Sequence, residues 1–172
     1  MKKSFLIILL FSIGLNAQET KDYSKNVATL DSTVTTLYSV ISGDKGEARN
    51  WELFKHLFKK DAKLIPTGKN EKNEITVRYM SPEDYIKTSG KWLVENGFHE
   101  VEIQRETQFF GNIAHIFSTY EAYKSKTDTT PLMRGINSIQ LFNDGKRWWI
   151  VNLYWKQESE GTPIPDKFLP KN

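Results

Sequence analysis

The second half of the chain carries polar side chains that could act as an acid, a base or a hydrogen-bond donor. They are His115, Tyr120, Glu121, Tyr123, Asn137, Asn152 and Tyr154. Proton transfer in a protein needs a base whose pKa is adjusted by burial, beside a donor that stabilises the negative charge formed on the substrate. No acidic residue falls at a position expected to face an interior pocket. This absence counts against strong catalysis.

The spacing of residues gives little support to metal or nucleophile chemistry. His56, His99 and His115 stand far apart, with no His-x-His or His-Glu-x-x-His pattern. We therefore expect each histidine to be hydrogen-bonded or at the surface, and we expect no metal site and no cofactor. The chain has no cysteine, which excludes disulfides, thiol catalysis and zinc–thiolate sites. Gly-rich phosphate loops and a Gly-x-Ser-x-Gly turn are absent.

Three helices are expected in the first half of the chain. Apolar residues recur at helical spacing over 30–41. A second, short helix begins after Asn50, which is a suitable N-cap. Its apolar stripe consists of Trp51, Phe54, Leu57 and Phe58. Ser81 and Pro82 begin the third helix, which Gly97 ends.

The remaining elements are expected to be strands. Two short strands are predicted at 62–65 and 75–80. From Phe98 the apolar period changes to two, which is typical of β-structure. Four long strands are predicted at 98–109, 113–125, 132–142 and 147–157. Helices followed by antiparallel strands indicate an α+β fold, a curved antiparallel sheet with the three helices packed on one face.

Strict alternation along the last strand divides its residues between two faces. One face carries Trp148, Ile150, Asn152 and Tyr154. Apolar walls with a few polar groups are the composition of a small-molecule pocket. We therefore expect a pocket between the third helix and the sheet, lined by Tyr38, Trp92, Tyr120, Trp148, Asn152 and Tyr154. The alternative is that Asn152 and Tyr154 lie at the solvent-exposed end of the strand.

The other face of the last strand is apolar as well. A strand that is apolar on both faces is buried on both sides, and the helices cover only one of them. We therefore expect a homodimer with twofold symmetry, formed through Trp149, Val151, Leu153 and Trp155. The alternative cover is the C-terminal tail, in which Ile164, Phe168 and Leu169 fold back over the sheet.

The N-terminus has the features of a cleavable secretory signal peptide over residues 1–17. Lys2 and Lys3 precede an apolar run that extends to Leu15, and Leu15 and Ala17 suit the −3 and −1 positions of a cleavage site. The run is shorter than the roughly 20 residues that a membrane span needs. We expect export to the periplasm or secretion, without membrane attachment after cleavage.

Removal of residues 1–17 leaves a chain the size of one domain. Residues 18–26 are a polar leader, 27–157 form the domain, and 158–172 form an irregular tail that contains three prolines. The signal segment carries two lysines and no acid, so cleavage lowers the formal net charge of +3 by two. A nearly neutral domain gives no reason to expect a nucleic-acid partner.

Three stretches of the domain carry a resemblance to a known family, Gly111–Glu121, Arg134–Leu141 and Asp144–Trp155. With the order of elements over 27–157, they resemble the nuclear transport factor 2-like superfamily, in its polyketide-cyclase-like (SnoaL-like) bacterial branch. The resemblance implies a conical, cystatin-like α+β fold, with a pocket between the helices and the concave face and frequent dimerisation through the sheet. Isomerases, cyclases, dehydratases and non-catalytic binding proteins share this fold, so the fold does not choose a function.

Three functions are therefore carried forward. The leading expectation is the binding of a small, partly apolar molecule without strong catalysis. The second is a cofactor-independent acid–base enzyme, such as an isomerase, cyclase or dehydratase. The third is a structural or protein-interaction module. A buried carboxylate or histidine within hydrogen-bond reach of a tyrosine would favour the enzyme, whereas a cone filled by Trp92, Trp148 and other rings would favour the structural role.

Overall fold

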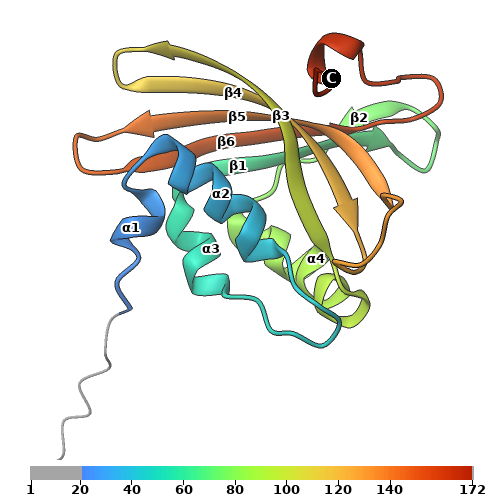
Figure 1. Ribbon diagram of the computed structural model, residues 1–172, viewed down its shortest axis with the longest axis horizontal. Coiled ribbons are helices and arrows are strands. Elements are labelled where there is room, and N and C mark those ends of the chain that lie inside the picture. Colours follow the sequence, from blue (N-terminus) through green and yellow to red (C-terminus); the bar gives the residue numbers. More distant parts are fainter. Residues whose placement is uncertain (1–20, 172) are drawn as a thin grey trace, which may run out of the picture.

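Six strands form one curved sheet in the computed structural model, which describes residues 21–171 (Figure 1). The strands are β1 (Phe58–Lys69), β2 (Ile75–Val77), β3 (His99–Phe110), β4 (Ile113–Tyr123), β5 (Met133–Asn143) and β6 (Trp148–Gln157). Their order is β2-β1-β6-β5-β4-β3, and only the β1–β6 pair is parallel. Helices lie against one face of this open sheet, so the predicted α+β class with a curved sheet is confirmed.

Four helices precede or interrupt the strands. They are α1 (Ser24–Val27), α2 (Leu30–Ile41), α3 (Trp51–Leu57) and α4 (Pro82–Asn96). Thr29 and Ser32 close a capping box at the start of α2, and Ser81 and Asp84 close another at the start of α4. These reciprocal hydrogen bonds satisfy backbone N–H groups that a helix start leaves unpaired. The predicted helix over 30–41 and the helix beginning at Pro82 are both present.

Gly97 ends α4 in a conformation that a larger residue would not tolerate. Its φ is +74°, and a Cβ atom at this position would lie 2.5 Å from the carbonyl oxygen of Lys124. The glycine therefore lets the chain pass close to the end of β4 and turn directly into β3. This turn places His99 and Glu100, the first residues of β3, next to α2 and α4.

The first strand is longer than predicted. Phe58 begins β1 instead of ending the helical stripe of α3, and β1 continues well past the predicted 62–65 segment. The reason is the partner strand, since Leu64 and Ile65 pair with Leu153 and Tyr154 of β6. Local apolar pattern cannot report such pairing, because the partner lies about 90 residues away along the chain.

A β-bulge at Val151 breaks the alternation along β6. Leu141 of β5 pairs with Ile150, but its neighbour Gln140 pairs with Asn152, so Val151 has no partner of its own. An extra residue of this kind reverses the facing of everything beyond it. Ile150 is fully buried under the helices, whereas Asn152 lies opposite Gln140 on the convex face.

The predicted division of the last strand into two faces is therefore wrong beyond Ile150. Leu153 and Trp155 point toward the helices and pack in or against the core. Asn152 and Tyr154 point the other way, and Tyr154 is 40% exposed. The four residues expected to form a dimer interface consequently do not share a face. The homodimer itself stays a prediction, without Leu153 and Trp155 in its interface.

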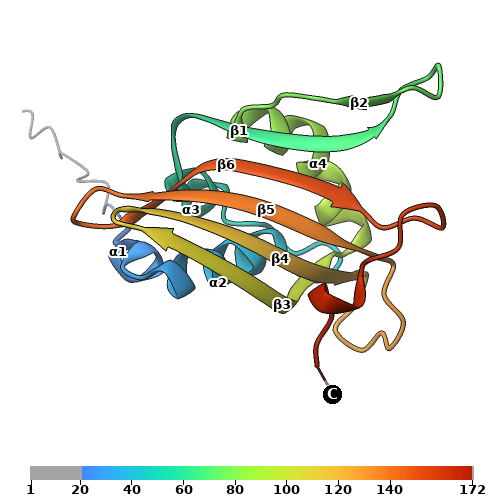
Figure 2. The same cartoon turned by 90° about the horizontal axis from the view of Figure 1, so that it is seen from above.

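The C-terminal tail covers part of the convex face (Figure 2). It contains the short 3-10 helix η1 (Asp166–Phe168), whose Phe168 ring packs on Phe117 with centroids 4.9 Å apart. Thr119 Oγ1 donates a hydrogen bond to the Phe168 carbonyl oxygen at 2.7 Å, and Ile164 is buried. This is the cover that was considered as the alternative to a partner chain.

The predicted signal peptide, residues 1–17, lies outside the described residues. Between residues 21 and 171, no helix combines the length and the hydropathy that a membrane span requires.

Candidate functional site

A cavity of about 210 Å³ lies between α2, α4 and the concave face of the sheet. Most of its wall is apolar or aromatic, and it comes from Leu37, Ile41, Phe54, Leu64, Trp92, Leu93, Phe98, Met133, Leu153 and Trp155. Five polar side chains interrupt this wall, those of Tyr85, Ser89, Glu100, Tyr120 and Asn137. The cavity thus has an apolar body with polar groups contributed by four different elements.

Glu100 supplies the carboxyl group of the cavity. It is the second residue of β3 and pairs with Ala122 of β4, a fully buried residue of the concave face. Burial raises the pKa of Glu100 to about 7, although a hydrogen bond donated by Asn137 Nδ2 to Glu100 Oε1 at 3.2 Å acts in the opposite direction. Because its pKa lies near neutrality, this carboxyl group can accept or donate a proton at ordinary pH.

Two tyrosine hydroxyls face the same space. Tyr85 comes from α4 and Tyr120 from β4, and burial followed by the nearby charge of Glu100 raises the pKa of both hydroxyls. Both therefore stay protonated and can donate. Neither hydroxyl hydrogen-bonds a protein atom within residues 21–171. Every fully buried side-chain nitrogen or oxygen of this part of the chain has a partner, so the two hydroxyls are not fully buried. Both line the cavity and are accessible from it.

Neighbouring residues fix the positions of these two rings. The Tyr85 ring stacks on Phe54 with centroids 5.3 Å apart and meets Trp155 edge-on. The Tyr120 hydroxyl lies over Gly135 of β5, where a Cβ atom would be only 2.6 Å from it. Glycine at 135 is thus what allows Tyr120 to lie flat across the sheet and reach the cavity.

Asn137 links the cavity to a row of buried polar groups behind it. It lies on β5, is 5% exposed, and its Nδ2 donates to Tyr38 Oη at 3.0 Å as well as to Glu100. Tyr38 Oη lies 2.6 Å from Ser118 Oγ of β4. These contacts cross from β5 to α2 and back to β4, so they also tie α2 to the sheet.

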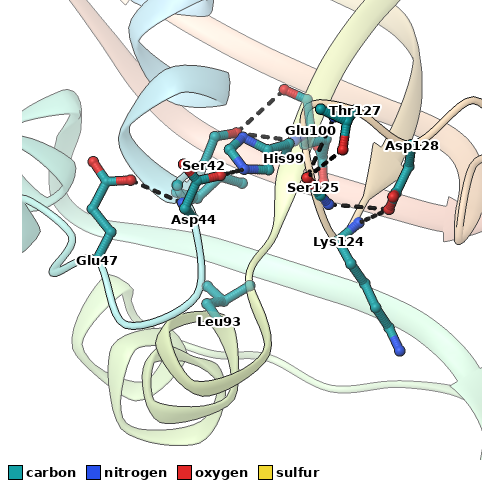
Figure 3. A network of polar contacts seen from close by, with 12 residues as sticks. Ser42, Asp44, Glu47, Leu93, His99, Glu100, Lys124, Ser125, Thr127 and Asp128 are labelled. Carbon is teal, nitrogen blue, oxygen red and sulfur yellow. Dashed lines mark hydrogen bonds and ion pairs between the residues drawn. The ribbon is translucent and has the colours of Figure 1, made fainter.

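A wider groove of about 640 Å³ runs along the free edge of β3, beside α2 and the 125–128 loop. Glu100 lines both this groove and the inner cavity. Figure 3 shows how the groove wall is held: His99 Nε2 pairs with Asp44 Oδ1 at 2.8 Å, and Ser42 Oγ accepts a hydrogen bond from Glu100 N at 2.9 Å. Asp128 accepts hydrogen bonds from the backbone N–H groups of Lys124 and Ser125.

The structure separates the six residues predicted to line a pocket. Trp92 and Tyr120 line the cavity, and Tyr38 stands directly behind it, bonded to Asn137. Trp148 packs instead on Phe109, near the start of β6. The bulge at Val151 moves Asn152 and Tyr154 to the convex face, and Tyr154 lines a separate hollow of about 240 Å³ under the tail.

The residue that sequence reasoning missed is Glu100. It begins the alternating run Glu100-Val101-Glu102, which is typical of a strand with a charged solvent-facing side. The structure shows the reverse, because Glu100 lines the cavity whereas Val101 is 45% exposed at the free edge. The expectation that no acidic residue faces the pocket is therefore wrong. The one available signal in the sequence was Gly97, because glycine tolerates a positive φ. That conformation brings the start of β3 against the helices.

The histidines have separate local partners. His56 Nε2 lies beside the Arg147 guanidinium, His99 pairs with Asp44, and His115 Nε2 lies 2.9 Å from Ser138 Oγ. Over residues 21–171, no three His, Cys, Asp or Glu side chains are grouped so that they could hold a metal ion.

Comparison with known proteins identifies the fold. No protein-family model matches the chain, and no curated protein matches it in sequence. Among solved structures, a protein of unknown function with a cystatin-like fold from Nostoc punctiforme superposes with a TM-score of 0.57 at 9% identity, over 76% of this chain and 89% of that one. An NTF-2 like protein of unknown function from Silicibacter pomeroyi gives 0.52 at 15% identity, over 80% and 100%.

A third similar structure is a candidate ketosteroid isomerase from Parabacteroides distasonis. It superposes with a TM-score of 0.53 at 13% identity, over 79% of this chain and 98% of that one. Together these likenesses show that the chain has the cystatin-like, nuclear transport factor 2-like fold, as its element order predicted. The SnoaL-like branch stays a prediction.

Proposed function

We propose that the chain binds a small, partly apolar molecule in the cavity between α2, α4 and the sheet. The observation that carries this proposal is the meeting of one carboxyl group, Glu100, with the hydroxyls of Tyr85 and Tyr120, which bond no protein atom within residues 21–171, on a mostly apolar wall. Groups of this kind orient a ligand that the apolar wall holds by burial. A purely structural role would favour a cone filled by aromatic side chains, whereas the side chains here leave a cavity.

The cavity volume limits the size of the ligand. An engineered apolar cavity of about 150 Å³ binds benzene, so the 210 Å³ found here suits a single substituted ring or a chain of similar bulk. Two phenolic donors suit an acceptor oxygen such as a carbonyl. A small cyclic ketone therefore matches both the size and the polarity of the site.

The binding proposal is tested with 2-cyclohexenone as the probe, titrated into isotope-labelled protein and followed by NMR. We expect Tyr120→Phe to weaken binding about tenfold, which is the cost of one lost hydrogen bond. Tyr154→Phe is the matched control, because that hydroxyl lies on the convex face. Equal weakening by both variants, or no saturable binding in the wild type, would contradict the proposal.

A second candidate function is proton transfer, and the near-neutral pKa of Glu100 favours it. In this role the Glu100 carboxylate would remove a proton next to the ligand carbonyl, while the tyrosine hydroxyls stabilise the resulting enolate. The test is deuterium uptake by 2-cyclohexenone in D₂O. We expect the rate to rise with pH through about 7, as the base form appears, and to fall at least about 100-fold in Glu100→Gln. An unchanged rate would exclude this role for Glu100.

Export is part of the same proposal, because the N-terminal segment has the order of charge, apolar run and small residue that signal peptidases cleave. Sequencing the N-terminus of the mature protein should therefore find a start near Gln18. Uncut protein confined to the cytoplasm would contradict export. Light scattering at micromolar concentration tests the predicted homodimer, and a monomer there would contradict it.

A further inference from the structure

A row of hydrogen bonds crosses the concave face of the sheet from Arg105 to the cavity. At its outer end, Arg105 Nε donates to Glu102 Oε1 at 2.8 Å, and Arg105 Nη2 donates to Glu102 Oε2. Arg105 Nη1 also donates to Asp31 Oδ1 at 2.6 Å. Ser118 Oγ donates to Glu102 Oε1, and beyond Ser118 the row continues through Tyr38 to Asn137.

The direction of every bond in this row follows from its outer end. A carboxylate held at both oxygens by a guanidinium is an acceptor only, so the single hydroxyl proton of Ser118 goes to Glu102. Ser118 Oγ must then accept the proton of Tyr38, 2.6 Å away. With its own proton committed, Tyr38 Oη can only accept from the Asn137 side chain.

This direction decides which way the Asn137 amide is turned. The atom of Asn137 that meets Tyr38 Oη has to be the nitrogen, because an amide oxygen has no proton to donate. The same nitrogen lies 3.2 Å from Glu100 Oε1, so its second proton points at the cavity carboxyl. An oxygen in that place would face both Glu100 and Tyr38 without a proton to share.

We infer that Arg105, acting through Ser118 and Tyr38, holds the Asn137 amide with its nitrogen toward Glu100, so that Glu100 Oε1 always accepts and any added proton resides on Oε2. Ser118, Tyr38 and Asn137 are then positioning residues for the cavity carboxyl. The inference deepens the proposed function, on which its meaning for a ligand rests, since it states which oxygen exchanges the proton. The geometry of the row itself exists without a ligand.

No other group near Glu100 replaces the hydrogen bond that Asn137 donates to it. The titratable groups around Glu100 in the cavity are Tyr38 from α2, Tyr85 from α4 and Tyr120 from β4, and all three have raised pKa values. In the wider groove that Glu100 also lines, the titratable groups include His99, Tyr123, Lys126 and Asp128. Glu102, on the same strand, is committed to Arg105. Asn137 alone lowers the pKa of Glu100, against the larger effect of burial. Turning the amide around would remove that donor and raise the pKa further.

The test is a ¹³C NMR titration of the Glu100 carboxyl in ligand-free protein. In Ser118→Ala, Tyr38 loses its acceptor and can donate to an inverted Asn137 amide. We expect the pKa of Glu100 to rise by about 1, the equivalent of one lost hydrogen bond. Ser118→Thr keeps the hydroxyl and should retain the wild-type value. Ser138→Ala, on the convex face beside His115, is the control that should change nothing.

Two further measurements test the same row of hydrogen bonds. Both Asn137 Nδ2 protons should exchange slowly with solvent in the wild type and faster in Ser118→Ala. Tyr38→Phe removes the hydroxyl that fixes the direction of the Asn137 amide, so the Nδ2 protons should exchange faster in this variant too. An unchanged pKa of Glu100 in folded Ser118→Ala, or unchanged Nδ2 exchange in Tyr38→Phe should the first variant fail to fold, overturns the inference. Loss of ketone binding with the pKa changes intact would refute only the proposed function.

Discussion

Two glutamates on one strand show how position decides the behaviour of a carboxyl group. Glu100 and Glu102 stand two residues apart on β3 and pair with neighbouring inward-facing residues of β4, Ala122 and Tyr120. Glu102 is held at both oxygens by Arg105 and receives a third hydrogen bond from Ser118. Glu100 receives one bond from a neutral amide, and no cation contacts it within the described chain.

The negative charge of Glu100 is therefore expected to lower the free energy of unfolding, whereas the charge of Glu102 is expected to raise it. A buried carboxylate without a counter-ion costs free energy in its charged form, whereas a paired and fully hydrogen-bonded carboxylate contributes to stability through its charge. An acid kept in the first condition indicates a functional constraint. Three substitutions break or sharpen this comparison.

The largest effect is expected from Glu100→Gln. The folded protein binds the Glu100 proton more tightly than the unfolded chain, because the pKa is about 7 instead of the ordinary 4.5. Wild-type stability is therefore lost as the pH rises from about 4.5 through 7. The variant should be more stable than the wild type by up to about 3 kcal/mol above pH 8, and equal to it below pH 4. Urea unfolding across this pH range measures the difference, and a variant less stable at pH 8 would contradict it.

The same substitution two residues away should act in the opposite direction. Glu102→Gln removes the charge that Arg105 grips at both oxygens and forces an N–H group against a donor. We expect a loss of about 2 kcal/mol at pH 7, the usual value for hydrogen bonds to a charged group. Glu106→Gln, on the exposed end of β3, is the control for charge alone. A stability change of the same sign in the 100 and 102 variants would remove the basis of the comparison.

The smallest effect is expected on the other side of the sheet. Phe168→Ala removes the half-buried ring of the tail that packs on Phe117. We expect a loss of about 1 kcal/mol in thermal or urea unfolding. The pKa of Glu100 should stay the same, because the convex face shares no hydrogen bond with the cavity row. A change in that pKa would mean that the two faces are coupled.

Local signals in the sequence were sufficient for α2, α3 and α4 and for the fold class, but not for the short helix α1, which lies at the end of the expected polar leader 18–26. Ser81-Pro82 and the apolar spacing over 30–41 report capping and burial that act within a few residues. The strands were located by their period of two. Their facing was not recoverable beyond Ile150, because a bulge is set by the partner strand and Val151 resembles any other β-branched residue.

The site was only partly predictable for a related reason. Trp92 and Tyr120 have apolar rings, so their inward direction follows from burial alone. Glu100 is charged, and a charged residue in an alternating strand is typical of a solvent-facing position. Its burial depends on α2, α4 and Gly97, elements that no pattern within β3 describes. The charge of a cavity carboxyl group therefore predicts exposure, and a strand pattern alone does not find such a residue.

The parallel pairing of β1 with β6 also has a consequence for how the chain folds. Phe58 and Ile150 are register partners, yet the whole of α4 and four strands lie between them. Closing so long a loop costs conformational entropy before any pairing compensates for it. During synthesis, β1 must wait until residues 148–157 have been made, with its apolar side exposed in the meantime. We expect β1 to dock last, so that the cavity closes only at the final step of folding.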